Sequence, residues 1–326
     1  MKTDGGKSIG VVVRRFLPKL GDYGRRSLRA LPTVFFLCGL SLAFAQAQIS
    51  VVTAHNDIAR TGQNLTERIL TPATVNPNNF GRLFSQAVDN PIRAQPLFVS
   101  GVTIPGKGVH NVVYVGSSAG TLYAFDADTN GGGNAVPLWE TSLLWGSSPT
   151  VYTILGTPTI DLTTNTMYVA IMTQENGNWA AHLHAVDITT GGEKFGGPTL
   201  IQGTVPGTGS GSVNGTLTFD PELEVQRAGL LLLNGVVYVP YASINDNGAW
   251  HGWIFAYNAA TLKLISIYCT TPNGNGGGIW QGGAGLAAEV NNPGKPYGRM
   301  FFSTGNGTIG VAPPLYKRPK LWDEPG

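Results

Sequence analysis

The sequence contains little charge, little cysteine and no long run of apolar residues at helical spacing. Only 12% of its 326 residues are charged, and its two cysteines are Cys38 and Cys269. No long window has apolar residues recurring every 3.6 residues, so little helix is expected. Cys38 lies in a segment that we predict to be cleaved, and Cys269 alone cannot form an intramolecular disulfide.

Basic residues are also scarce outside the N-terminus. The formal net charge of +2 arises because residues 1–47 hold eight Lys and Arg residues against two acidic ones. The rest of the chain then carries 13 basic and 17 acidic residues. A surface that binds nucleic acid requires a basic stripe. Nucleic acid is therefore excluded as a partner.

Residues 1–47 have the three parts of a secretory signal peptide. Basic residues precede an apolar run at 31–42, and a segment of small residues at 43–47 follows it. The apolar run is well short of the roughly 20 residues that span a bilayer. We predict cleavage after Ala45 or Ala47, no transmembrane span in the mature chain, and export to the periplasm or the extracellular space.

What the chain has in abundance is repetition. Its 45 glycines and 21 prolines suit many short strands joined by tight turns. Three stretches share an apolar strand centred on Tyr, a polar turn, and a second strand that ends at Asp or Asn, and a fourth copy follows. The central aromatic residues are Tyr114, Tyr168, Tyr238 and Phe301. A repeat at this spacing predicts stacked β units.

We therefore predict an all-β fold, a β-propeller of four-stranded antiparallel blades. The expected strands of the first blade are residues 95–99, 111–116, 121–126 and 137–142. The second blade is expected at about 156–202, the third at about 228–271, and a fourth unit from Met300. Residues 48–310 are predicted to form an incomplete propeller of about three and a half blades, with 80–85 as a closing strand. The Pro-rich residues 311–326 are predicted to be an irregular tail.

Five segments resemble those of a known family. They read HNDIARTGQN at 55–64, LYAFDA at 122–127, LHAVD at 183–187, WQGG at 280–283 and TGNG at 304–307. They are similar to segments of bacterial proteins with pyrroloquinoline-quinone-type (PQQ-type) β-propeller repeats, which share their fold with quinoprotein alcohol dehydrogenases. The resemblance covers about residues 50–310. It implies seven or eight blades, so the chain is expected to be a truncated member.

The resemblance also offers a cofactor. Family enzymes stack the quinone between a Trp and a disulfide of adjacent cysteines, and they hold calcium with Glu, Asn and Asp. This chain has no pair of adjacent cysteines. Trp280 is the candidate platform for the quinone, since an aromatic face suits a planar ring; the alternative is that it packs between blades. No catalytic acid or base can be matched, so no catalytic residue is assigned.

A second candidate site is a calcium loop. Asp126, Asp128 and Asn130, followed by Gly131, match the D-x-D-x-N-G opening of such a loop. The twelfth position, where calcium needs a bidentate Glu, is Pro137. The alternative interpretation is that Asp126 caps a hairpin turn, as Asp and Asn commonly do.

Two histidines lie in one predicted strand. His182 and His184 flank Leu183, so both side chains point to the same face of the sheet, an arrangement that suits zinc. No third ligand follows at a recognisable spacing. His184 also occupies the repeat position of Tyr123 and Phe255, which favours packing between blades.

The function predicted from these observations is an exported propeller that acts as a binding or scaffold module. Its partner would be an unknown protein, a small molecule or a glycan. One alternative is a PQQ-dependent dehydrogenase or a fragment of one. A further alternative is a carbohydrate- or cell-surface-binding propeller, which requires Trp179, Trp250 and Trp253 to gather on one rim.

Overall fold

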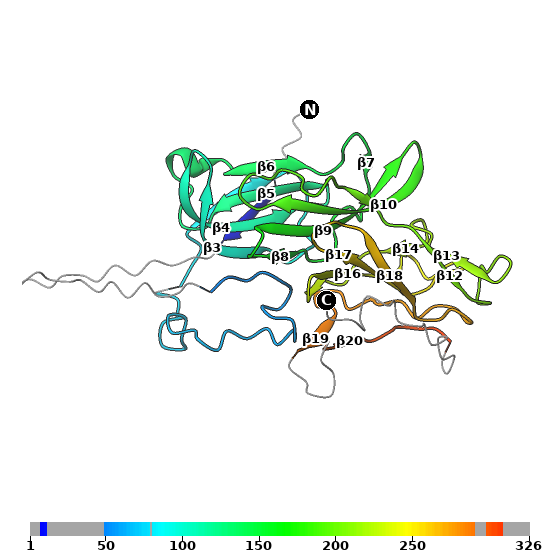
Figure 1. The fold of residues 1–326 in the computed structure, drawn as a ribbon. Coiled ribbons are helices and arrows are strands. Elements are labelled where there is room, and N and C mark those ends of the chain that lie inside the picture. Colours follow the sequence, from blue (N-terminus) through cyan, green and yellow to red (C-terminus); the bar gives the residue numbers. More distant parts are fainter. Residues whose placement is uncertain (1–6, 12–48, 79, 291–297, 309–326) are drawn as a thin grey trace, which may run out of the picture.

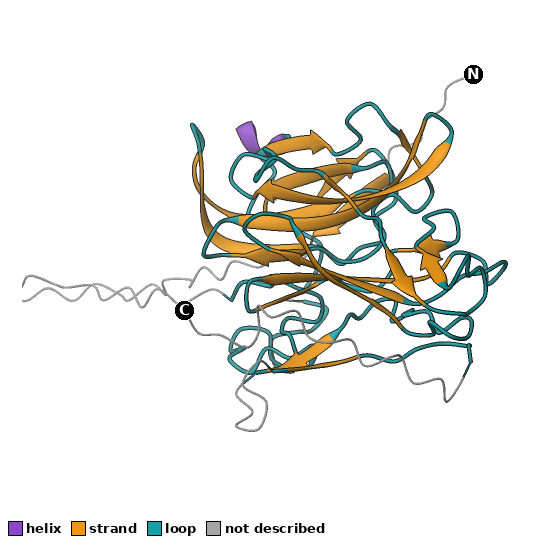
Figure 2. Cartoon of the chain, turned by 45° about the vertical axis from the view of Figure 1, so that its right-hand side comes forward, coloured by secondary structure: helices purple, strands orange, loops and turns teal. Residues whose placement is uncertain are grey.

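The computed structural model describes residues 7–11, 49–78, 80–290 and 298–308. Most of the predicted signal peptide and all of the predicted Pro-rich tail lie outside these residues. The described chain is almost entirely strand and loop (Figures 1 and 2), with one short 3-10 helix, η1 (Gly132–Ala135). In this part of the chain, no helix is long and apolar enough to cross a membrane.

Three antiparallel sheets correspond to the three predicted blades. The first has the order β3 (Leu97–Ile104), β4 (Gly108–Gly116), β5 (Thr121–Asp126) and β6 (Trp139–Ser142). The second contains β7 (Ser148–Pro149), β8 (Thr159–Asp161), β9 (Thr166–Glu175), β10 (Asn178–Asp187) and β11 (Thr199–Leu200). The third contains β14 (Glu224–Val225), β15 (Leu231–Leu233), β16 (Val236–Ser243), β17 (Trp253–Asn258) and β18 (Leu264–Cys269). The prediction of an all-β, partial propeller with antiparallel blades is confirmed. The second and third sheets have five strands instead of four, because β7 and β8 both pair with β9, and β14 and β15 both pair with β16.

Three two-stranded sheets complete the described fold. They are β1 (Lys7–Val11) with β2 (Phe84–Val88), β12 (Thr204–Pro206) with β13 (Thr216–Thr218), and β19 (Ala287–Glu289) with β20 (Arg299–Phe301). The β19–β20 pair is the fourth unit that was expected from Met300. The β12–β13 hairpin was not foreseen, because its sequence reads as a Gly/Ser/Thr loop.

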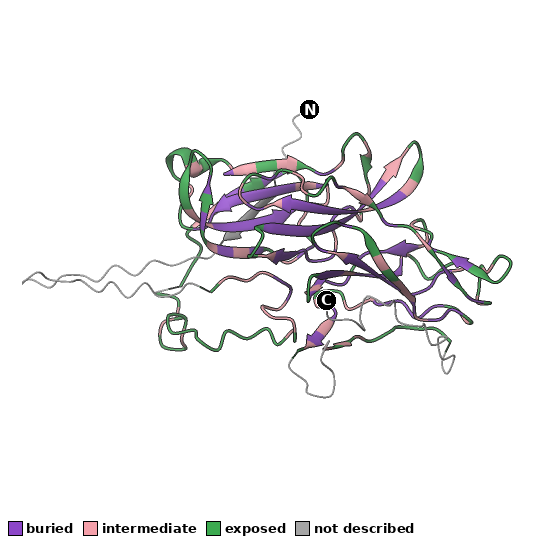
Figure 3. Cartoon of the chain, viewed as in Figure 1, coloured by how far each residue is buried: buried purple, intermediate pink, exposed green. Residues whose placement is uncertain are grey.

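The sheets stack face to face because alternate residues of each strand point to opposite neighbours. On β4, Tyr114 joins a buried cluster with Met167 and Ile171 of the second blade. Its neighbour Val115 instead packs with Val88 of β2. A third cluster joins the second and third blades. Figure 3 shows that burial is concentrated in these central strands, and each fully buried large apolar side chain contributes about 1.5–3 kcal/mol.

The central tyrosines of the repeat link successive blades. The Tyr114 hydroxyl donates to the carbonyl of Ile188 at 2.9 Å, and the Tyr168 hydroxyl donates to that of Ala259 at 2.8 Å. The two acceptors lie in the turns that follow β10 of the second blade and β17 of the third blade. Burial raises the pKa of Tyr168 to about 12, so the hydroxyl keeps its proton at neutral pH. Tyr114 and Tyr168 therefore repeat in sequence because both make the same contact between blades.

The strand predicted at 80–85 is shifted along the chain. The observed strand is β2 at Phe84–Val88, which pairs with β1. Leu83 is 52% exposed, whereas Gln86 and Val88 are buried. The alternation that faces the first blade starts only at Phe84, so the predicted boundaries were wrong by four residues at the start and three at the end.

A half-buried arginine anchors the segment before β2, and we call its contacts the Arg60 junction. The guanidinium donates to the carbonyls of Ala54 at 2.8 Å, Leu230 at 2.9 Å and Leu286 at 2.9 Å, and to the Thr53 hydroxyl at 2.6 Å. Burial lowers the pKa of Arg60 to about 10, which leaves it charged at neutral pH. One side chain thereby ties the N-terminal segment to the third blade and the fourth unit.

Candidate functional site

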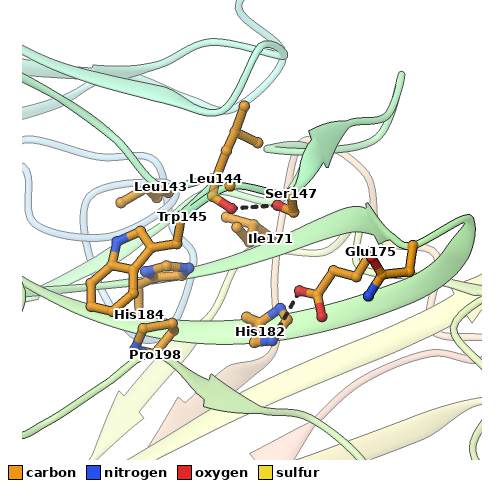
Figure 4. Close-up of a pocket in the computed structure, with 11 residues that line it drawn as sticks. Leu143, Leu144, Trp145, Ser147, Ile171, Glu175, His182, His184 and Pro198 are labelled. Carbon is orange, nitrogen blue, oxygen red and sulfur yellow. Dashed lines mark hydrogen bonds and ion pairs between the residues drawn. The ribbon is translucent and has the colours of Figure 1, made fainter.

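A cavity of about 300 Å³ lies where the first blade meets the second (Figure 4). We call it the His184 pocket. It is bounded by the loop that follows β6 and by strands β9 and β10. The lining residues are Leu143, Leu144, Trp145, Gly146, Ser147, Ile171, Glu175, Asn176, His182, His184 and Pro198.

His184 lines this pocket from the middle of β10, and its side chain is 1% exposed. Its Nδ1 lies 2.9 Å from Oε2 of Glu193. The other oxygen of Glu193 accepts the backbone N–H of Ala185 at 2.9 Å, so the carboxylate is fixed on both sides. A carboxylate partner places the proton of a neutral imidazole on Nδ1. Nε2 then carries a lone pair, and among the described residues it has no hydrogen-bond partner.

His184 occupies a repeat position that holds an aromatic residue in the other two blades. Tyr123 and Phe255 occupy the same repeat position in the first and third blades, and both are buried in apolar clusters. A buried polar atom without a partner costs about 1–3 kcal/mol. The second blade has thus replaced a core aromatic residue with an imidazole that leaves one nitrogen unsatisfied.

His182 lies on the same face, as the alternation predicted, and Figure 4 shows both rings on the pocket side. Its Nε2 is 3.5 Å from Oε1 of Glu175, and the two imidazole centroids are 6.5 Å apart. Burial lowers the pKa of His182, partly offset by the Glu175 charge. No group of three or more His, Cys, Asp or Glu side chains in the described ranges could hold a metal ion. The histidine pair therefore lacks the third protein ligand that zinc requires.

Trp145 lines the pocket from the loop that follows β6 and was not foreseen. It is 64% exposed and has a φ of +47°, an unfavourable region for a bulky residue. Such outliers concentrate at ligand sites. The Ser147 hydroxyl donates to the carbonyl of Leu144 at 2.5 Å and closes the turn. Trp145 lies in an irregular loop, so no periodic pattern in the sequence predicts its position in the pocket.

The three predicted calcium ligands have separate partners. Oδ1 of Asp126 accepts the backbone N–H groups of Asp128 and Thr129, each at 2.8 Å. Asp128 accepts the amide of Asn111 at 2.9 Å, and Asn130 donates to the carbonyl of Ser85 at 3.4 Å. This is the capped turn that the alternative interpretation described. Calcium binding stays an untested prediction.

The remaining oxygen of Asp126 makes a contact that sequence reasoning missed. Oδ2 lies 2.6 Å from Nδ1 of His110, and Nε2 of His110 lies 2.9 Å from the carbonyl of Lys107. The hydrogen bond with Asp126 raises the pKa of His110 above its ordinary value. Because Val112 pairs with Asp126, His110 is the diagonal neighbour of Asp126 on one face.

Trp280 is half-buried and packs against the apolar cluster between the second and third blades. A Cβ built on Gly305 would lie 2.6 Å from Cδ1 of the indole, so the chain at Gly305 lies directly against the ring. The packing alternative stated for Trp280 describes this position. The buried side-chain oxygen of its neighbour Gln281 has no hydrogen-bond partner in the described chain.

The three tryptophans proposed for a carbohydrate rim do not form one. Trp253 is 0% exposed and Trp250 is 6% exposed, so that prediction was wrong. Trp253 lies on a central strand that is buried on both faces. Such a strand lacks the alternation of polar and apolar residues that would have indicated which side chains are buried. Trp179 is half-buried and lines a second cavity of about 620 Å³ with Phe219 and Pro221.

The third blade contains a buried carboxylic acid. Glu224 is 1% exposed. Its Oε1 accepts the backbone N–H of His251 at 3.1 Å and the indole N–H of Trp253 at 3.3 Å, and Oε2 accepts the N–H of Asp220 at 3.0 Å. Burial raises the pKa of Glu224 to about 8. Its three hydrogen bonds come from neutral donors only.

Comparison with known proteins gives structural similarity alone. No protein-family model and no curated protein sequence matches the chain. Among solved structures, a quinohaemoprotein alcohol dehydrogenase from Pseudomonas putida matches at 15% identity over 68% of this chain and 29% of that one, with a TM-score of 0.40. A europium-containing methanol dehydrogenase matches at 14% identity over 69% and 42%, with a TM-score of 0.44. The chain spans less than half of either structure, and identities this low transfer no activity.

Proposed function

We propose that the chain is a β-propeller binding module and that its ligand site is the His184 pocket. The observation that carries this proposal is the buried, unpartnered Nε2 of His184 in the wall of the cavity. Buried polar atoms in folded proteins almost always have partners, and each exception calls for a physical cause. A bound molecule that donates a hydrogen bond to Nε2 supplies that cause.

The surrounding elements suit a preformed site. His182 and His184 stand on β10, which pairs with β9 over ten residue pairs from Asn178↔Glu175 to Asp187↔Thr166. Glu193 fixes the orientation of the His184 ring from behind. Sites built on rigid strands and supported by a second layer of hydrogen bonds hold their geometry well. Trp145 supplies an exposed aromatic wall on the loop side.

The residues offered for a quinone do not fit that cofactor well. Gly305 lies against the Trp280 indole, and Cys269 is a buried free thiol with no adjacent cysteine in the sequence. Oδ1 of Asp126 is occupied by backbone N–H groups and its Oδ2 by His110. We therefore derive no quinone chemistry for this chain, and the dehydrogenase alternative has no support from side-chain geometry.

Nuclear magnetic resonance of the His184 ring tests the binding proposal. Small alcohols, amines and carboxylates are added one at a time at about 10 mM, high enough to detect millimolar affinity. A ligand in the pocket is expected to shift the Nε2 resonance of His184 and the indole resonance of Trp145, while His110 stays unchanged. If no probe moves His184 or Trp145 in the folded protein, the pocket is not a ligand site.

Export remains a separate proposal, supported by the basic, apolar and small-residue order of residues 1–47. The expected result is that protein recovered from the expressing bacterium starts at Gln46 or Gln48. Mass spectrometry of the intact chain checks this. Exported protein that still carries residues 1–45 would contradict this proposal.

A further inference from the structure

We infer that the His184 pocket binds a small organic cation, namely a protonated primary amine. This inference rests on the proposed function, because it names the class of ligand for the same site. It is argued from the hydrogen-bonding capacity and charge of the pocket wall.

The wall offers acceptors where a ligand would sit. The ring proton of His184 is committed to Glu193, so Nε2 presents a lone pair. The hydroxyl proton of Ser147 is committed to the carbonyl of Leu144, so its oxygen also presents lone pairs. Glu175 adds a carboxylate at the mouth, with 43% of its side chain exposed. The other polar groups of the wall are mixed, because the His182 imidazole and the Asn176 amide can each donate and accept, and the Trp145 indole N–H donates.

The charge of the wall has one sign. Glu175 is the only carboxylate among the described lining residues, and neither Lys nor Arg lines the pocket. A carboxylate ligand would meet Glu175 without a compensating cation, whereas an ammonium ion is attracted to it. Burial holds His182 toward its neutral form, since its pKa is lowered. One carboxylate, the unpartnered Nε2 of His184 and the lack of a Lys or Arg among the described lining residues give a wall suited to a positive ligand.

An ammonium group matches the wall better than a hydroxyl does. An ammonium nitrogen has three donors and no acceptor, whereas a hydroxyl must also be given a donor. The exposed ring of Trp145 adds a surface for the alkyl chain and an aromatic face that attracts the charge. A cavity of about 300 Å³ admits an amine of a few carbons.

The test uses three probes of equal length: n-butylammonium, 1-butanol and butyrate. Affinity is measured by calorimetry, and location by the His184 and Trp145 resonances. We expect n-butylammonium to bind at least about tenfold more tightly than 1-butanol, equal to about 1.4 kcal/mol, and butyrate to bind most weakly. An alcohol or carboxylate that binds at His184 as tightly as the amine overturns this inference and leaves the proposed function standing.

Three variants assign the effect to the pocket. His184→Phe introduces the residue type found at the same repeat position in the third blade, so the fold has a precedent for it, and amine binding is expected to vanish. Glu175→Gln should weaken n-butylammonium about fivefold and leave 1-butanol unchanged. Glu140→Gln, which changes an exposed carboxylate on β6 outside the pocket, is the matched control and should change the affinity for neither probe.

Equal loss of n-butylammonium affinity in Glu140→Gln and Glu175→Gln would mean that the ligand responds only to the overall charge of the protein. If none of the three probes moves His184 or Trp145, the proposed function and this inference fail together.

Discussion

His110 in the first blade and His184 in the second are alike on one side and different on the other. Each places Nδ1 against a carboxylate, Asp126 at 2.6 Å and Glu193 at 2.9 Å. The Nε2 of His110 meets the carbonyl of Lys107, whereas the Nε2 of His184 meets nothing in the described structure. Only the second ring borders the cavity described between the blades.

The difference separates a structural histidine from a candidate ligand-binding one. Both neighbours of His110 are acceptors, so the ring donates from both nitrogens, which favours the imidazolium form. His184 has one acceptor neighbour and keeps a free lone pair. Both histidines pair with a carboxylate, but only His184 keeps a ring nitrogen that can accept a hydrogen bond from a third molecule.

Glu224 in the third blade extends the comparison to a carboxyl group without a histidine partner, and it gives the largest expected effect. Its pKa is raised from 4.5 to about 8, so the folded state binds a proton that the unfolded state has released. Stability is fully present below pH 4.5 and is lost as pH rises to about 8, by on the order of 5 kcal/mol. Urea unfolding from pH 4.5 to 8.5 should show this decline in the wild type and a flatter profile in Glu224→Gln. Parallel profiles would show that Glu224 is solvated.

Replacing each of the two histidines by Phe is expected to have the next largest effect on stability. His110→Phe leaves the buried Oδ2 of Asp126 and the Lys107 carbonyl without their donor, and we expect a loss of about 2–3 kcal/mol. His184→Phe removes an unsatisfied nitrogen along with one hydrogen bond to Glu193, so we expect a loss of about 1 kcal/mol or less. Urea unfolding at pH 6 measures both. Equal losses would mean that Nε2 of His184 has a partner in solution.

Asp126→Asn tests the carboxylate side of the first-blade pair. Asn258 holds the corresponding turn of the third blade by accepting the N–H of Ala260 at 3.0 Å, so the turn itself should survive. The loss of the charged partner of His110 is expected to cost about 1 kcal/mol, and Asp126→Ala about 0.5–2 kcal/mol more through the lost cap. A calcium-dependent rise in melting temperature that both variants abolish would instead establish the predicted calcium loop.

The smallest expected effect is the pH dependence of His110. Its pKa is raised above 6.5, chiefly by the hydrogen bond with Asp126, so the folded state favours the protonated ring. The stabilisation is complete below pH 6.5 and is lost as pH rises through the folded pKa. The free-energy difference between the wild type and His110→Phe should therefore shrink as pH rises above 6.5. A difference that grows with pH would contradict the double-donor geometry.

Sequence alone could predict the features that repeat. The tyrosine-centred strands, the capped turn at Asp126 and the shared face of His182 and His184 all follow from local alternation or turn chemistry. The strand preceding the first blade was misplaced because exposed Phe80 and Leu83 imitate a buried pattern.

The candidate site could be predicted only in part. His184 was singled out, but its partner Glu193 lies beyond a turn, where it joins the blade through one isolated bridge to Val186. Trp145 belongs to an irregular loop and carries no periodic signal. The burial of Trp250 and Trp253 depends on the packing of whole sheets. Each of these features depends on tertiary contacts, which residue spacing within a single sequence does not predict.

The Arg60 junction has a consequence for the order of events during synthesis. Its hydrogen bonds to Leu230 and Leu286 span 170 and 226 residues, whereas most strands of a blade pair with their sequence neighbours. Local hairpins can form as they leave the ribosome, but contacts this distant must wait. Arg60 is therefore made before all three blades and is fixed only after Leu286 has been added. Until then its guanidinium has to remain in water.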